Sequence, residues 1–120
     1  MDLERSKRFY REILVVRPDF PFPGAWFAIG GHQQLHLIAH GNPTFRKSNK
    51  IDTQDVHVAV RVGAFRETVE FLHGQGYRAD AVDGDPMKLI VRPRPTAGFP
   101  QIYILDPDRH VIEINSEELD

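Results

Sequence analysis

The sequence predicts an α+β fold built from two similar series of elements joined by a polar linker. Each half combines one helical pattern with short strands of alternating polarity. A polar stretch without apolar periodicity, residues 42–54, separates module 1 (residues 1–41) from module 2 (residues 55–116). The second series opens with a strand and follows the order strand, helix, strand, strand, strand. The first series opens directly with its helix, so we expect two βαβββ modules of which the first lacks its leading strand.

Composition and charge exclude several classes of protein. The 120 residues suffice for one domain with a real core, and 41% apolar with 27% charged residues is ordinary for a globular protein. The net charge of −2 provides no basic field for nucleic acid. Neither a membrane-spanning apolar run nor a secretory signal is present in the sequence, so a cytoplasmic location is expected. Because cysteine is absent, the candidate metal ligands are His, Asp and Glu.

The first series begins with a predicted helix over residues 3–14. Asp2 is placed to cap this helix, and an apolar stripe predicts one buried face. The proline-rich residues 17–24 cannot continue a helix. Strands are predicted over residues 25–29 and 33–39, on either side of a glycine turn.

The second series begins with a strand in which valines alternate with His57, Ala59 and Arg61. Glycine at residue 74 or 76 ends the helix that follows. An Asp-Pro-Asp turn signal separates the two strands of the closing hairpin. The predicted elements are a strand over residues 56–62, a helix over 64–74, strands over 77–82 and 87–91, and the hairpin over 101–115.

A carboxylate, Glu113, lies in the middle of the last predicted strand. Its neighbours Ile112 and Ile114 point to the opposite face, so burial of this strand is expected on both sides. A buried charge is costly unless it is compensated, and a bound cation is one common compensation.

Two histidines can be placed with this carboxylate. His36 lies in the last strand of the first series, at the place that matches Glu113, and His57 lies on the strand face opposite the valines. Two imidazoles and one carboxylate suit Zn, Ni, Fe or Mn and leave open positions for water or substrate. The alternative for each histidine is a hydrogen-bonded structural role, and for the glutamate a half-exposed strand edge. His40 is a reserve ligand.

Several stretches, taken in order, resemble a known family. The residues that carry the likeness are 2–14, 24–37, 57–60 and 106–114. Together they resemble the vicinal oxygen chelate superfamily, which includes glyoxalase I, methylmalonyl-CoA epimerase, extradiol dioxygenases and the bleomycin- and fosfomycin-resistance proteins. The likeness looks closest to the glyoxalase-like branch related to lactoylglutathione lyase.

This resemblance implies a cup-shaped mixed sheet with helices outside and a divalent metal at its floor. His36, His57 and Glu113 fall on three of the family's four ligand positions. The fourth is usually a histidine in the leading strand of the first module, which this chain lacks. Arg109 departs from the family pattern, which often has glycine in that turn.

The resemblance also implies a metal-dependent lyase or isomerase that acts on a small, oxygen-rich substrate through a metal-stabilised enediolate. Glu113 would serve as both ligand and base. We expect Arg61, Trp26 and Tyr103 to contact the substrate.

Two other functions and one assembly stay open. A non-catalytic protein could bind a planar antibiotic, as bleomycin-resistance proteins do, with aromatic residues and no metal; the candidates are Trp26, Phe20, Phe22 and Phe99. An Fe(II) dioxygenase would use the same type of ligand set. Because a missing strand would expose backbone donors and acceptors, we expect a homodimer.

Overall fold

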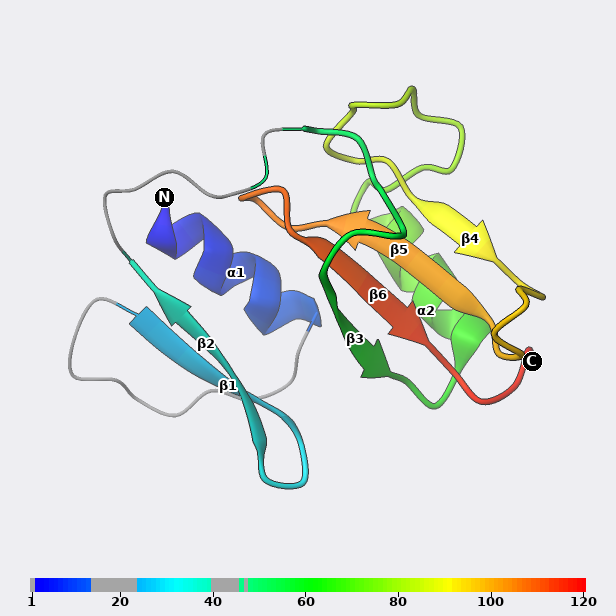
Figure 1. Ribbon diagram of the computed structural model, residues 1–120, viewed down its shortest axis with the longest axis horizontal. Coiled ribbons are helices and arrows are strands. Elements are labelled where there is room, and N and C mark those ends of the chain that lie inside the picture. Colours follow the sequence, from blue (N-terminus) through cyan, green and yellow to red (C-terminus); the bar gives the residue numbers. More distant parts are fainter. Residues whose placement is uncertain (1, 14–23, 40–45, 47) are drawn as a thin grey trace. The chain divides into compact units, whose positions relative to one another are not determined.

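The computed structural model describes residues 2–13, 24–39, 46 and 48–120. Its elements follow the order α1, β1, β2, β3, α2, β4, β5, β6 along the chain (Figure 1). They belong to two compact units: unit 1 comprises Met1–Arg46 and Asp106–Asp108, and unit 2 comprises Lys47–Leu105 and Arg109–Asp120. In the described ranges, no helix has the length and apolar composition needed to span a membrane.

The described part of unit 1 contains a helix and a hairpin. Helix α1 spans Leu3–Ile13, and strands β1 (Gly24–Gly30) and β2 (Gln33–Ile38) pair in antiparallel orientation. Asp2 caps α1 as predicted, because the backbone N–H of Arg5 donates to Asp2 Oδ1 at 3.0 Å. The predicted last residue of this helix, residue 14, lies outside the described residues.

One face of the hairpin in unit 1 is apolar and buried. Ala25, Phe27 and Leu37 are all withdrawn from solvent, as are Ser6 and Tyr10 of α1. The rings of Tyr10 and Phe27 lie 6.0 Å apart, so the inner side of α1 contacts this face. The strand alternation places His36 on the other face.

Hydrogen bonds hold the Asp106–Asp108 segment to α1 within unit 1. The buried hydroxyl of Tyr10 donates to Asp106 Oδ2 at 2.6 Å, and the hydroxyl of Ser6 donates to Asp108 Oδ2 at 3.3 Å. The backbone N–H of Asp108 donates to Asp106 Oδ1 at 2.9 Å, which stabilises the predicted turn. Burial, and then the adjacent charge of Asp106, raise the pKa of Tyr10 above its ordinary value.

Unit 2 has the order strand, helix, strand, strand, strand of the predicted βαβββ module, with one strand fewer than the individually predicted elements. Its strands form one mixed sheet in the order β3-β6-β5-β4, in which β3 runs parallel to β6 and the other neighbours are antiparallel. The α+β class and the βαβββ module are therefore confirmed. The elements are β3 (His57–Arg61), α2 (Phe65–Gly74), β4 (Ile90–Arg92), β5 (Gln101–Leu105) and β6 (Val111–Asn115).

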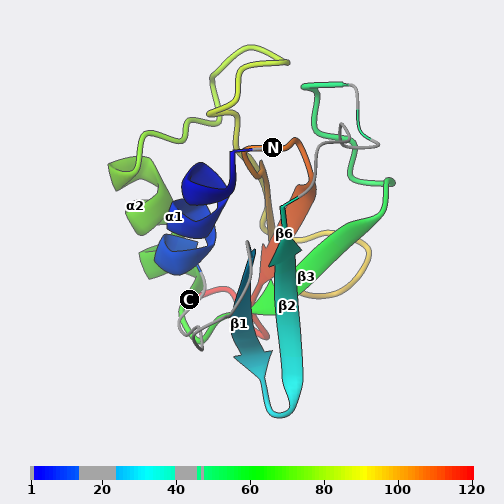
Figure 2. The ribbon, with the colours of Figure 1, turned by 90° about the vertical axis from the view of Figure 1, so that its left-hand side faces the viewer.

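The sheet of unit 2 is covered on both faces. Figure 2 shows α2 on one side of the sheet and the segment of residues 48–56 on the other. Strands β5 and β6 are consequently buried along their whole length. The residues packed on the α2 side are Phe65, Leu72, Ile102, Ile104, Ile112 and Ile114, and those on the opposite side are Ile51, Ile90, Tyr103, Leu105 and Val111. The polar residues of β5 and β6 on the second face, Gln101, Glu113 and Asn115, are therefore withdrawn from water.

Two predicted strands of unit 2 differ from the structure. The strand over residues 77–82 is wrong, because Arg78 forms only an isolated parallel bridge with Lys88 and turns follow it. The ammonium group of Lys88 donates to two carbonyls of this loop at 2.6 and 2.8 Å, so a side chain satisfies groups that a strand partner would need. The strand predicted over residues 87–91 begins later, since β4 spans Ile90–Arg92.

Two other elements agree more closely with prediction. The helix over residues 64–74 is confirmed as α2, and its inner residues Phe65 and Leu72 are buried. The strand over residues 56–62 is shorter at both ends, and Val56 is 90% exposed.

An arginine occupies the position of the β5–β6 turn that favours glycine. Arg109 has a φ of 70°, in the left-handed region where a Cβ atom crowds the backbone. The arginine that departs from the family pattern in this turn is therefore in a strained backbone conformation.

Replacement of Tyr10 should change how stability depends on pH. The folded protein keeps the Tyr10 proton at a pH where the unfolded chain, with a tyrosine pKa of about 10, releases it. The stabilisation is fully present below pH of about 10 and declines above it by about 1.4 kcal/mol per pH unit. Tyr10→Phe should lower the unfolding free energy at neutral pH by about 1–3 kcal/mol, since Asp106 loses a donor. The difference from wild type should shrink above pH of about 10. Urea titrations at several pH values measure the unfolding free energy of both proteins, and a difference that stayed constant with pH would contradict this account.

Substitution of Arg109 should relieve backbone strain. Arg109→Gly should be more stable than Arg109→Ala by about 1 kcal/mol, because both remove the guanidinium but only glycine accepts a positive φ at no steric cost. Chemical denaturation of the two variants side by side measures this difference, and equal midpoints would show that the turn stores no strain.

Candidate functional site

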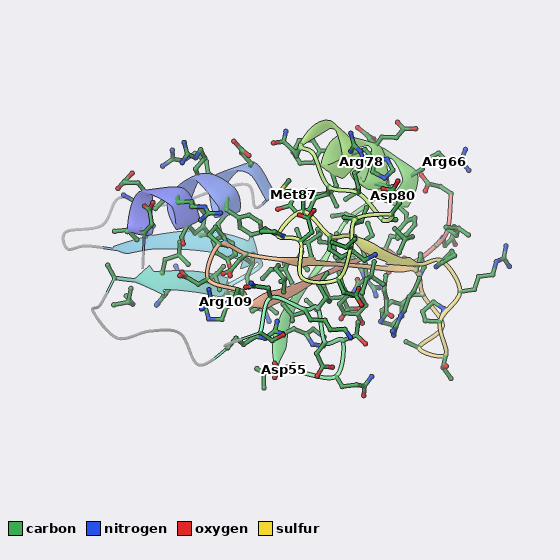
Figure 3. All side chains as sticks on the ribbon, turned by 90° about the horizontal axis from the view of Figure 1, so that it is seen from above. Asp55, Arg66, Arg78, Asp80, Met87 and Arg109 are labelled. Carbon is green, nitrogen blue, oxygen red and sulfur yellow. The ribbon has the colours of Figure 1, made fainter. Side chains whose placement is uncertain are left out.

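The structure brings together two of the predicted ligands, His57 and Glu113, inside unit 2. They come from the parallel neighbours β3 and β6, where Ala59 is the direct partner of Glu113 and His57 lies diagonally from it. His57 Nε2 and Glu113 Oε2 are 3.1 Å apart. Both side chains lie on the sheet face opposite α2. Figure 3 shows that Asp55, just before β3, is on the side of the sheet opposite Arg66 of α2.

The backbone carbonyl of Asp55 determines which nitrogen of His57 faces Glu113 as an acceptor. His57 Nδ1 lies 2.7 Å from this oxygen, and a carbonyl can only accept, so Nδ1 carries a proton. In the neutral ring, Nε2 then presents a lone pair to the carboxylate oxygen of Glu113. Two acceptor atoms at this distance repel each other unless they share a proton or a metal ion. A carbonyl on Nδ1 is also the arrangement that orients a metal-binding imidazole.

The carboxylate of Glu113 has further partners that the sequence analysis missed. Its exposed fraction is 6%, and Oε1 accepts hydrogen bonds from Gln101 Nε2 at 2.8 Å and from Asn115 Nδ2 at 3.3 Å. Gln101 and Asn115 are direct partners across β5 and β6, on the same face as Glu113. Their positions two residues from Tyr103 and Glu113 are visible in the sequence, and the strand period could have indicated them.

Tyr103 forms one wall of the site. It is the direct partner of Glu113 across β5 and β6, and its ring meets the ring of His57 edge to face at 5.8 Å. Burial, followed by the charge of Glu113, raises the pKa of Tyr103, while Arg92, 5.7 Å from the ring centre, acts in the opposite direction. The hydroxyl of Tyr103 therefore stays protonated at neutral pH.

Arg61 lies at the edge of the site. Its Nε donates to Asn115 Oδ1 at 3.0 Å, and its Nη1 lies 3.6 Å from Glu117 Oε1. The guanidinium stacks over the ring of Phe99 at 5.1 Å, while 48% of the side chain is exposed. Arg61 is thus partnered within unit 2 and also open to solvent.

The third predicted ligand, His36, belongs to unit 1. It is exposed in β2, and its Nε2 lies 3.0 Å from Gln34 Oε1. Its direct strand partner is Trp26, whose side chain lies outside the described part of the chain, so the predicted substrate contact there stays a prediction. The role of His36 as a ligand also stays a prediction. His40, Phe20 and Phe22 lie outside the described residues.

The donor chemistry of unit 2 fits a divalent metal, although the described residues contain no group of three possible ligands. One imidazole nitrogen and one carboxylate oxygen, from His57 and Glu113, are ligand types that suit Zn, Ni, Fe or Mn. When the ring of His57 is neutral, the lone pair of its Nε2 faces Glu113, and this supports the fit. Further ligands would have to come from water, from substrate or from protein groups outside this pair.

Comparisons with known proteins identify the fold. A scan against protein-family models and a search of curated proteins found no match. Among solved structures, an integron cassette protein from V. cholerae has a TM-score of 0.61 at 19% identity, with 96% of this chain and 86% of that chain covered. A lactoylglutathione lyase from Agrobacterium tumefaciens has a TM-score of 0.61 at 18% identity, with 96% and 85% covered.

A third solved structure is named for the glyoxalase family. A protein described as a member of the glyoxalase family, from Bacillus anthracis, has a TM-score of 0.58 at 23% identity, with 94% of this chain and 82% of that chain covered. At these identities the likeness concerns the fold. The chain therefore has the fold of glyoxalase-family proteins, and its resemblance to the vicinal oxygen chelate superfamily is confirmed at the level of the fold.

Proposed function

We propose that this protein is a metal-dependent lyase or isomerase of the glyoxalase type. Its substrate would be a small molecule with oxygen atoms on neighbouring carbons. The observation that carries this proposal is the approach of His57 Nε2 to Glu113 Oε2 at 3.1 Å, with the other ring nitrogen held by a backbone carbonyl. Such a pair of facing acceptors is arranged to hold a cation or to pass a proton.

A divalent ion held by His57 Nε2 and Glu113 Oε2 would supply a Lewis acid that withdraws charge from neighbouring oxygens. Glu113 would move the proton, since Oε2 is the oxygen that faces the site while Oε1 is engaged by amide donors. Asp55 keeps the imidazole of His57 in its orientation. The buried ring of Tyr103 limits the access of water to this carboxylate.

The ends of this sheet face differ in polarity, which bears on the substrate. Leu105 and Val111 form the apolar end with Ile51, whereas Arg61 and Arg92 lie at the polar end. A substrate would meet a cationic side chain and the ring of Tyr103 beside Glu113. This supports the predicted contacts of Arg61 and Tyr103 with an oxygen-rich molecule.

A metal-free binding protein is the second candidate. The guanidinium of Arg61 stacked on Phe99 at 5.1 Å forms a flat surface at the rim of the site, which suits a planar ligand. Metal content separates the two candidates.

The wild-type protein should bind close to one divalent ion per chain. In calorimetric titration with Zn²⁺, His57→Gln should weaken binding by more than about 100-fold, because the imidazole donor is lost. His73→Gln is the matched control, since His73 is exposed on α2 and distant from Glu113 in the sheet. If the wild type bound no zinc, or if both variants bound it equally, the enzyme proposal would fail and the binding protein would be favoured.

Removal of the charge on Glu113 should abolish turnover. We take the hemithioacetal of methylglyoxal and glutathione as the probe, because proton transfer between its adjacent oxygen-bearing carbons yields lactoylglutathione, the compound in the name of the Agrobacterium relative. Loss of the proton acceptor should lower the rate of Glu113→Gln by about 10²–10⁴-fold, as followed by thioester absorbance. Glu70→Gln, on the exposed side of α2, is the control and should keep the wild-type rate. Unchanged turnover in Glu113→Gln would remove this residue from the mechanism.

A further inference from the structure

We propose that Gln101 is a positioning residue that holds the carboxylate of Glu113 by one oxygen and reserves the other for a cation. Gln101 Nε2 donates to Glu113 Oε1 at 2.8 Å, and both side chains are buried, with exposed fractions of 8% and 6%. A hydrogen bond from a neutral donor to a buried carboxylate is strong, because few water molecules compete for it.

Asn115 gives Oε1 of Glu113 a second donor, and its orientation is determined by Arg61. The guanidinium of Arg61 can only donate, so Asn115 Oδ1 is the accepting atom. The amide nitrogen of Asn115 is thereby turned toward Glu113, 3.3 Å from Oε1. Arg61 thus acts on the carboxylate through Asn115.

These contacts make the two oxygens of Glu113 unequal. The hydrogens of two amides lie against Oε1 and repel a cation there, while Oε2 faces His57 Nε2 at 3.1 Å. A freely rotating carboxylate would offer either oxygen or both. The hydrogen bond from Gln101 therefore fixes the rotation of the Glu113 carboxylate before a cation binds. The loss of this rotational entropy then no longer opposes binding. This inference rests on the proposed function only for the identity of the cation.

The experiment compares Co²⁺ binding by wild type, Gln101→Leu and Gln33→Leu. Gln33 is exposed in β2, so its replacement is a matched control for the same change of side chain. Gln101→Leu should bind Co²⁺ about 10- to 100-fold more weakly than the control, the usual effect of losing a group that orients a ligand. It should also show an altered visible spectrum at saturation, which a loss of stability alone would not produce. Circular dichroism verifies that each variant is folded.

Cobalt affinity of Gln101→Leu equal to that of Gln33→Leu, with wild type binding the ion, would overturn the positioning role. A wild-type protein that takes up no cobalt would instead contradict the proposed function. The role of Gln101 is then decided by nuclear magnetic resonance on the metal-free protein. Its side-chain amide protons should be shifted and exchange slowly with solvent, and signals like those of exposed Gln33 would overturn the proposal.

Discussion

A buried carboxylate is the constraint on which the rest of unit 2 depends. Glu113 lies in the middle of a strand whose two faces are both covered, so water cannot solvate its charge. A buried charge without partners costs several kcal/mol, on the order of the stability of a small domain. The sheet compensates for this cost with amide donors from two strands, Gln101 of β5 and Asn115 of β6 itself. Strand β3 places His57 Nε2 3.1 Å from the other carboxylate oxygen, where a shared proton or cation would complete the compensation.

The parallel pairing of β3 with β6 is the topological feature that makes this compensation possible. Helix α2, β4 and β5 separate β3 from β6 along the chain, yet β6 pairs beside β3 in the sheet. His57 and Glu113 are thereby brought together across 56 positions of sequence. Side chains from both neighbouring strands reach Glu113 because β6 lies in the interior of the sheet, which an edge strand would not permit.

Within each unit, the hairpin pairs its residues in the same register. Trp26 is opposite His36 in unit 1, and Tyr103 is opposite Glu113 in unit 2. In both hairpins the residues of the alternate face are apolar and buried, as in Phe27 and the isoleucines of β5 and β6. The residues at these corresponding register positions differ in type, histidine in one hairpin and glutamate in the other.

Predictions that depend on neighbouring residues were more accurate than those that depend on contacts between distant parts of the chain. The cap by Asp2, the helix α2 and the closing hairpin depend on near neighbours, and all three are confirmed. The strand predicted over residues 77–82 is wrong because β-branched and aromatic residues indicate a strand only if a partner strand is available. In its place the side chain of Lys88 satisfies the carbonyls.

The sequence by itself determined the α+β class, the βαβββ order and the presence of a carboxylate in a buried strand, because periodicity and turn residues act over a few positions. Only the tertiary structure decided which groups meet that carboxylate. The tautomer of His57 depends on the carbonyl of Asp55, and the contact of Gln101 depends on the pairing of β5 with β6. Those contacts arise from strand register and from hydrogen-bond direction in three dimensions, neither of which is expressed in residue order alone.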